Sequence, residues 1–145
     1  MTLHLLKPAV QVDDLYEFAD RQKNFLTRHQ DGQILFPVWT SRRPARANEL
    51  LNGGSVYWII KRHIACRQDI IDIVELPPGG GREKPAYLIM ADPVLIRTQA
   101  RPKKPFQGWR YLKPQDAPAD IGKLDQDKER PPPEMEEELI RLGLL

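Results

Sequence analysis

Residues 97–112 carry the side chains best suited to binding chemistry. The segment holds five of the chain's 22 basic residues and no acidic one, and residues 106–111 read Phe-Gln-Gly-Trp-Arg-Tyr. Guanidinium groups bind phosphates through paired hydrogen bonds, and ammonium groups add point charges. Aromatic rings stack on unpaired bases for roughly 1 to 3 kcal/mol each. The combination is typical of a surface that binds nucleic acid.

A second basic stretch, residues 42–67, contains six Lys or Arg residues and Glu49 as its only acid. If the strands between them fold back, the two stretches form one surface. No predicted recognition helix carries the charge, so single-stranded or modified nucleic acid fits better than a duplex major groove. The candidate nucleic-acid-binding residues are Arg42, Arg43, Arg46, Lys61, Arg67, Arg101, Lys103, Lys104, Gln107, Trp109, Arg110 and Tyr111.

The aromatic residues have a second interpretation, which is burial in the core. Val56 and Ile60 flank Trp58 with strand alternation, so the core is the favoured place for Trp58. Trp109 is evenly balanced, because its neighbours Gly108 and Arg110 are flexible or polar. Trp39 could also offer a ring for stacking.

Metal and nucleophilic chemistry have little support in the sequence. The three histidines and Cys66 lack a close metal-ligand spacing, and a strand would place His63 and Cys66 on opposite faces. Cys66 has no identifiable base, so we interpret it as a small buried residue. Gly79–Gly81 are followed by neither Lys-Ser/Thr nor a predicted helix, which argues against a phosphate loop. We predict no catalytic residue, no metal and no cofactor.

The composition indicates one domain with an unusual amount of irregular structure. The chain has 145 residues, 41% of them hydrophobic and 29% charged, and its 14 prolines are nearly twice the usual share. Residues 1–114 contain 18 Lys/Arg against 11 Asp/Glu, whereas residues 115–145 contain 4 against 9. We therefore expect one α+β domain over residues 1–114 and a proline-rich acidic strap over 115–145. A single cysteine and the absence of a leader or a long apolar run favour a cytoplasmic protein and no membrane partner.

The hydrophobic patterns place these residues on a series of short elements. Helical spacing predicts helices over residues 14–29 and 45–51, with Asp14 as the cap of the first, and a short C-terminal helix over 134–143. Strand patterns predict a first strand at residues 2–7 and a second strand at 34–40, which Pro37 either confines to an edge of the sheet or interrupts. Two central strands are predicted at 56–60 and 70–74. Residues 61–69 link them, and the second of these strands is expected to be long or bulged. A strand pair at 86–90 and 93–96, an exposed arm at 101–105 and a return strand at 106–112 follow.

No helix is predicted between residues 55 and 96, which argues against a parallel α/β fold. The fold class is therefore α+β, with a mostly antiparallel sheet or a partly open β-barrel. Two helices lie in the N-terminal half and a short one at the C-terminus.

Three strings of sequence resemble a known bacterial family. They are residues 48–61, with Gly-Gly-Ser-Val-Tyr-Trp at 53–58, then residues 101–112, and the final Leu-Gly-Leu-Leu at 142–145. The chain resembles the domain of unknown function 1489 family (DUF1489), which occurs mainly in alphaproteobacteria. The resemblance implies a bacterial cytoplasmic protein and no particular activity. More distantly, the layout is similar to the PUA-like barrels, including the ASCH and EVE groups, which bind RNA or modified bases.

The leading functional hypothesis is a nucleic-acid-binding module for RNA or for an unpaired or modified base. A second hypothesis is an enzyme or small-ligand binder for an anionic substrate, with a pocket near residues 107–111. A third is a protein-interaction module whose C-terminal helix docks on a partner.

Overall fold

The computed structural model describes residues 2–124 of the chain. Within them, the helices are α1 (Leu15–Lys23), α2 (Ala47–Leu50) and the short 3-10 helix η1 (Pro114–Asp116). The strands are β1 (His4–Pro8), β2 (Thr27–Arg28), β3 (Ile34–Thr40), β4 (Ser55–Ile60), β5 (His63–Leu76), β6 (Ala86–Ala91), β7 (Ile96–Pro102), β8 (Arg110–Leu112) and β9 (Asp120–Lys123).

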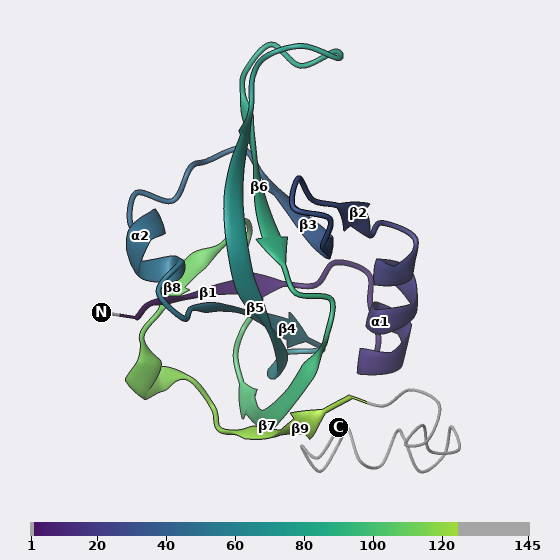
Figure 1. Ribbon diagram of the computed structural model, residues 1–145. Helices are drawn as coiled ribbons and strands as arrows, with labels where there is room; N and C mark the ends of the chain where they lie inside the picture. Colours follow the sequence, from purple (N-terminus) through teal and green to yellow (C-terminus); the bar gives the residue numbers. More distant parts are fainter. Residues whose placement is uncertain (1, 125–145) are drawn as a thin grey trace.

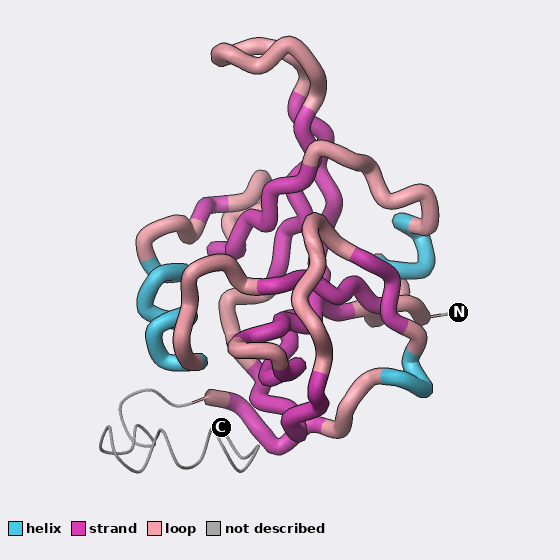
Figure 2. Tube along the Cα trace, turned by 180° about the vertical axis from the view of Figure 1, so that it is seen from behind, coloured by secondary structure: helices cyan, strands magenta, loops and turns pink. Residues whose placement is uncertain are grey.

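The long strand β5 organises the sheet. Its first half lies between β4 and β7, and its second half pairs with β6. The strand order is β2-β3-β6-β5-β4-β1-β8, and β9 pairs with the far side of β7. The β1–β4 pair is parallel and the other pairs are antiparallel. The sheet does not close on itself, α1 and α2 lie on opposite sides of the molecule, and the end of the β5–β6 hairpin projects from the body (Figures 1 and 2). The predicted α+β class with a mostly antiparallel sheet is confirmed.

The two predicted central strands are present, but the segment predicted to link them is wrong. The second strand is long and bulged, with register shifts beside Ala65 and Ile71. However, residues 63–69 of the expected link belong to β5, and the turn consists of Lys61 and Arg62 alone, with φ of 47° and 67°. Two residues with positive φ form the tight turn whose twist matches an antiparallel hairpin.

The first helix begins as predicted and ends six residues earlier. The Asp14 carboxylate accepts the Glu17 N–H at 2.8 Å, which caps the helix. Beyond Lys23 the chain leaves the helix, because Thr27 pairs with Leu35 in the β2–β3 ladder. This strand pairing outweighs the helical spacing of residues 24–29.

Strand β3 spans the predicted residues, and Pro37 lies at an edge. The β2–β3 ladder reaches only Leu35, so the far side of Pro37 has no neighbouring strand. A residue without an N–H is tolerated there. The helix predicted over 45–51 is confirmed in the shorter form of α2.

The predicted strand pair at 86–90 and 93–96 is wrong in its second member. The Asp92 carboxylate accepts the Val94 N–H at 2.9 Å, and this turn directs the chain away from β6. Strand β7 therefore starts at Ile96 and pairs with β5 and β9. Arg101 and Pro102, expected in an exposed arm, are the last residues of this strand.

The C-terminal part of the described chain adds two pieces to the sheet. The predicted return strand is present as β8, which pairs with β1 over three residues. Beyond residue 114, η1 leads to β9, which extends the sheet next to β7. The predicted helix over 134–143 lies outside the described residues.

The sheet separates two clusters of buried side chains. Leu5, Trp58 and Trp109 belong to the larger cluster, which α1 joins through Phe18. Leu6 and Tyr57, their strand neighbours, belong to the smaller one, because successive side chains point to opposite faces. The predictions of core positions for Trp58 and Cys66 are confirmed. In residues 2–124, neither α-helix combines the length and the apolar character that crossing a bilayer requires.

Candidate functional site

Two of the predicted arginines fold back on the two predicted stacking rings. The Arg42 guanidinium lies 4.1 Å from the centre of the Trp109 ring, and the Arg46 guanidinium lies 5.7 Å from that of Tyr111. Arg42 Nη2 donates to the Trp109 carbonyl at 3.3 Å, and the Arg46 backbone N–H donates to the Tyr111 hydroxyl at 3.1 Å. Cation–π contacts and hydrogen bonds therefore fasten the β3–α2 loop to the β8 segment.

Trp109 is a core residue in this arrangement. It is 7% exposed, and its Nε1 donates to Thr40 Oγ1 at 3.0 Å. Its ring meets the Tyr111 ring edge-on at 5.0 Å between centroids. With Arg42 against its ring, Trp109 offers little surface on which a base could stack.

Arg110 points away from Trp109, to the other face of the sheet. It pairs with Leu6 of the smaller cluster, and its guanidinium lies 4.2 Å from the centre of the Phe106 ring. Arg101 pairs with Ile64 of the same cluster and donates to the Asp116 carbonyl. The sheet therefore divides the predicted cations instead of gathering them into one surface.

The other predicted cations lie on exposed loops. The Lys103 N–H donates to the Arg62 carbonyl at 2.8 Å, which brings Lys103 beside the Lys61 turn. Lys104 and Gln107 follow in the exposed segment that leads to β8, and Arg43 is exposed in the β3–α2 loop.

Arg67 is part of an internal ion-pair network. Its Nη2 lies 2.8 Å from Asp120 Oδ2, and its Nη1 lies 2.6 Å from Asp69 Oδ1 and 2.9 Å from Ser55 Oγ. The hydrogen bonds with Asp120 hold the pKa of Arg67 above its usual value. These contacts join β4, β5 and β9. Because the guanidinium of Arg67 already binds the side chains of Asp120, Asp69 and Ser55, it is engaged within the protein.

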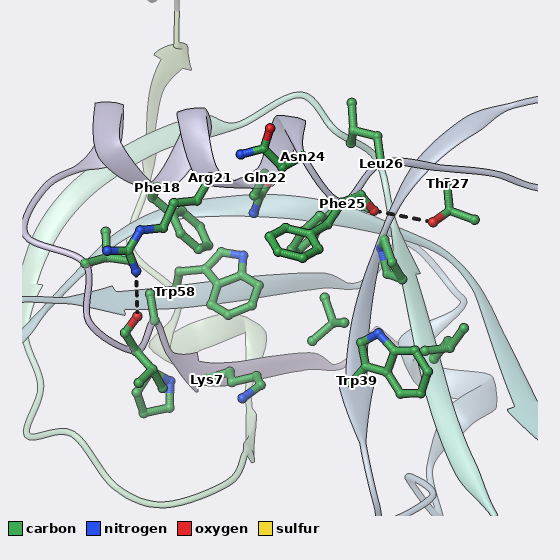
Figure 3. A pocket seen from close by; sticks show the side chains of 18 residues that line it. Lys7, Phe18, Arg21, Gln22, Asn24, Phe25, Leu26, Thr27, Trp39 and Trp58 are labelled. Atoms are coloured by element: carbon green, nitrogen blue, oxygen red, sulfur yellow. Dashed lines mark hydrogen bonds between the residues drawn. The ribbon is translucent and has the colours of Figure 1, made fainter. Parts of the chain in front are cut away.

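An aromatic pocket with a volume of about 680 Å³ lies near these elements. It opens between the C-terminal end of α1 and strand β3, and side chains of β1 and β4 line it as well (Figure 3). Its rings come from Phe18, Phe25, Phe36, Trp39 and Trp58. Phe25 is 64% exposed and Trp39 is 54% exposed, so two ring surfaces remain open to solvent. The volume lies within the range of small-molecule sites.

The early end of α1 creates one wall of the pocket. Phe25 and Leu26 follow the helix cap at Asn24, and β2 then holds this wall against β3. Behind the rings, Trp58 Nε1 donates to Gln68 Oε1 at 2.9 Å, which fixes the indole in its plane. The pocket is therefore preorganised by the ladder and by this hydrogen bond.

The charged residues of the pocket lining, Lys7 and Arg21, are both basic, and the lining includes no Asp or Glu. Arg21 lies 2.8 Å from Glu17 and its Nη1 donates to the Val10 carbonyl at 3.4 Å. Lys7 is half-buried, and burial lowers its pKa below the usual value. The pocket is thus positively charged and favours anionic ligands.

Comparison with known families adds the identity of the chain. The family model described as a protein of unknown function (DUF1489) matches residues 5–145. The chain belongs to the DUF1489 family. No curated protein and no solved structure matches this chain. The match confirms the family resemblance inferred from residues 48–61 and 101–112.

Other chemistry in this DUF1489 protein is limited by burial and spacing. Within residues 2–124, no three His, Cys, Asp or Glu side chains gather as a metal site would require. Cys66 is fully buried, and burial raises the pKa of its thiol, which disfavours the reactive thiolate.

Sequence reasoning missed the pocket of this DUF1489 member, although one of its rings was considered. Trp39 is considered there as a possible stacking residue, whereas Phe25 falls within the helix predicted over residues 14–29. Asn24 followed by Phe25 is compatible with a helix cap, but nothing local indicates that β2 follows. Lys7 gave no signal, because its importance depends on its neighbours across the sheet.

Proposed function

We propose that this protein is a nucleic-acid-binding module that takes an unpaired or modified base of RNA, or of another single strand, into the aromatic pocket. The observation that carries the proposal is the pair of exposed rings, Phe25 and Trp39, at a pocket without acidic residues. Solvent-exposed rings gain stacking energy from a base, and the positive charge of the lining attracts a polyanion.

Cations around Trp39 supply partners for the phosphates. The Arg82 guanidinium lies 5.9 Å from the centre of the Trp39 ring. Arg82 and Lys84 line a second hollow of about 530 Å³, which shares Trp39 with the aromatic pocket. The exposed Arg43 lies three residues beyond the end of β3. In this proposal the stacking role passes from Trp109 and Tyr111 to Phe25 and Trp39, and Arg43 keeps its phosphate role.

The layout of elements expected from the sequence, which is similar to that of PUA-like barrels, favours the same proposal as an analogy of fold alone. A second candidate function is that of an enzyme or small-ligand binder for an anionic substrate. The volume of the aromatic pocket favours it. For this second candidate function, the substrate would bind in the aromatic pocket and not beside residues 107–111.

The test is fluorescence anisotropy with a labelled single-stranded RNA of about twelve nucleotides, the same sequence in DNA, and the RNA duplex, over a series of salt concentrations. We expect the single strands to bind more tightly than the duplex and the affinity to fall steeply with salt. Phe25→Ala and Trp39→Ala should each lower the affinity by about tenfold or more, the loss of one stacked base.

The matched control is Ile121→Ala, which removes an exposed apolar side chain on β9, outside the pocket lining. It should bind as the wild type does. All three variants should keep the unfolding temperature, since these side chains are exposed. The absence of binding at low salt, salt-independent retention, or wild-type affinity in both ring variants would exclude the proposal.

A further inference from the structure

Lys7 is a charged residue on the sheet face that lines the aromatic pocket. In the parallel β1–β4 ladder it pairs with Trp58. In the β1–β8 ladder Leu6 pairs with Arg110, and Trp109 immediately precedes β8. Both tryptophans belong to the larger core cluster. Because Lys7 pairs with Trp58 and follows Leu6 of the smaller cluster, its side chain starts beside this indole, on the face of the sheet that carries both tryptophans.

The Lys7 ammonium has no partner within the described part of the chain. Neither a hydrogen bond nor an ion pair to its Nζ is found there, and no carboxylate lines the pocket. Arg21, the other cation of the lining, is neutralised by Glu17 at 2.8 Å. Among the described residues, Lys7 is therefore the charge of the pocket lining that has no counter-charge.

A half-buried ammonium without a counter-charge is unfavourable in the free protein. Its partial loss of hydration favours the neutral amine, and the neighbouring indoles offer no acceptor to replace the lost water. An anion that enters the pocket would stabilise the charged ammonium of Lys7 in place of the lost water. The attraction between the two charges is screened less by water in the pocket than it would be at the surface. A neutral ligand of the same shape would gain nothing from Lys7.

We propose that the pocket selects a planar heterocycle that carries an anionic group, with the ring against the aromatic walls and the anionic group on Lys7. The inference rests on the proposed function for the use of the pocket and adds the chemical class of its ligand. The charge can come from the phosphate of a nucleotide or from an acidic substituent on the ring.

Two pairs of probes separate these sources. Orotate and uracil differ by a carboxylate on the ring, and uridine monophosphate and uridine differ by the phosphate. Binding is measured by calorimetry or by quenching of tryptophan fluorescence. We expect the charged member of at least one pair to bind the wild type at least tenfold more tightly than its neutral partner. The pair that shows this difference identifies the source of the charge.

Lys7→Met keeps the apolar stem and removes the ammonium. It should abolish the preference for the charged probe and leave the affinity for the neutral one within about twofold, while Lys7→Arg should keep the preference. The matched control is Lys23→Met on α1, outside the lining of the aromatic pocket, which should behave as the wild type does. Unfolding temperatures establish that each variant folds.

The outcomes distinguish this inference from the proposed function. If single-stranded RNA depends on Phe25 and Trp39 but neither probe pair shows a Lys7-dependent preference, the function stands and the anion inference is wrong. If RNA does not bind but one charged probe binds through Lys7, the pocket selects anions and the nucleic-acid function is wrong. Equal affinity for charged and neutral probes, or no binding of any probe, overturns the inference.

Discussion

Gln22 and Gln68 exchange two hydrogen bonds between their side-chain amides, at 2.9 and 2.7 Å, although 46 positions separate them in the chain. Gln68 also accepts from Trp58 Nε1 at 2.9 Å and donates to the Asp92 carbonyl at 3.1 Å. An indole N–H only donates and a carbonyl only accepts, so these contacts fix the orientation of both amides. The buried network joins α1, β4 and β5 behind the aromatic pocket.

Substitutions that break this network should lower the free energy of unfolding, and the losses of the single variants should not be additive. Gln68→Leu leaves Gln22 and the Trp58 N–H buried without partners, which should lower the free energy of unfolding by roughly 2 to 4 kcal/mol. Gln22→Leu should cost less, because Gln68 retains Trp58 and Asp92. Urea unfolding of both single variants and the double variant measures the coupling.

In the double variant neither amide remains, so its loss should be smaller than the sum of the two single losses. Equal single losses that simply add would contradict the description of the two amides as a pair. Gln99→Leu, on the exposed side of β7, is the control and should change stability little.

Trp109→Ala should act on stability rather than on binding alone. The ring is buried beside Tyr111 and beneath Arg42, so its removal leaves a large cavity. The expected loss is about 3 to 5 kcal/mol in the free energy of unfolding. Trp39→Ala, which truncates an exposed indole, provides the comparison in thermal unfolding. A Trp109→Ala protein with the unfolding temperature of the wild type would show that the ring is not a core residue.

Gly54 should tolerate no side chain. A Cβ at this position would lie 2.2 Å from the Leu3 carbonyl oxygen and 2.4 Å from that of Leu50. Both are backbone atoms at the junction of α2 and β1, so Gly54→Ala must displace one element. We expect a loss of about 3 kcal/mol or more, at or beyond the upper end of overpacking penalties.

The control for Gly54 is Gly32→Ala, where a Cβ meets nothing within 4 Å and only the φ of 91° is unfavourable. Its loss should be roughly 1 kcal/mol. Calorimetric unfolding of both variants tests the difference. Equal losses at the two positions would mean that the contact with β1 and α2 is not the cause.

Arg62→Gly should stabilise the protein. Arg62 has a φ of 67° in the two-residue β4–β5 turn, a conformation that glycine adopts without strain. The expected gain in the free energy of unfolding is about 0.5 to 1 kcal/mol. The backbone strain that the substitution removes exceeds the stability that is lost because glycine raises the conformational entropy of the unfolded chain. The Arg62 carbonyl that accepts from Lys103 is kept. Chemical denaturation is the measurement, and a loss of stability would show that the arginine side chain contributes more than its backbone strain costs.

His4 should make stability depend on pH below its ordinary pKa of 6.5. Its Nδ1 accepts the Ser55 N–H at 3.0 Å, so this nitrogen must be unprotonated in the folded state. Burial, and then the charge of Arg67, lower the pKa of His4 below its ordinary value of 6.5. The unfolded chain therefore binds a proton first, and stability falls as the pH drops below 6.5, down to the folded-state pKa.

His4→Gln should flatten this part of the stability profile, as measured by urea midpoints at several pH values. A His4→Gln protein with the wild-type slope would assign the pH dependence to other groups.

Several features of this protein follow from the sequence because their causes are local. The cap of α1 needs only Asp14 and the N–H of Glu17, three positions away. The edge position of Pro37 follows from its missing donor, and the turn after Leu76 follows from the chemistry of residues 77–81. Alternation along β4 predicts that Trp58 is buried. Each of these depends on neighbours within a few residues.

The tertiary structure alone decided the site. Whether α1 ends at Lys23 or at His29 depends on the pairing of Thr27 with Leu35, and the position of Lys7 beside Trp58 depends on a ladder between residues 51 positions apart. Trp109 could be a binding or a core residue until Arg42 and Thr40 were placed against it. The types of the residues predicted a surface suited to binding, whereas strand pairing over long distances determined which rings are buried and which are exposed.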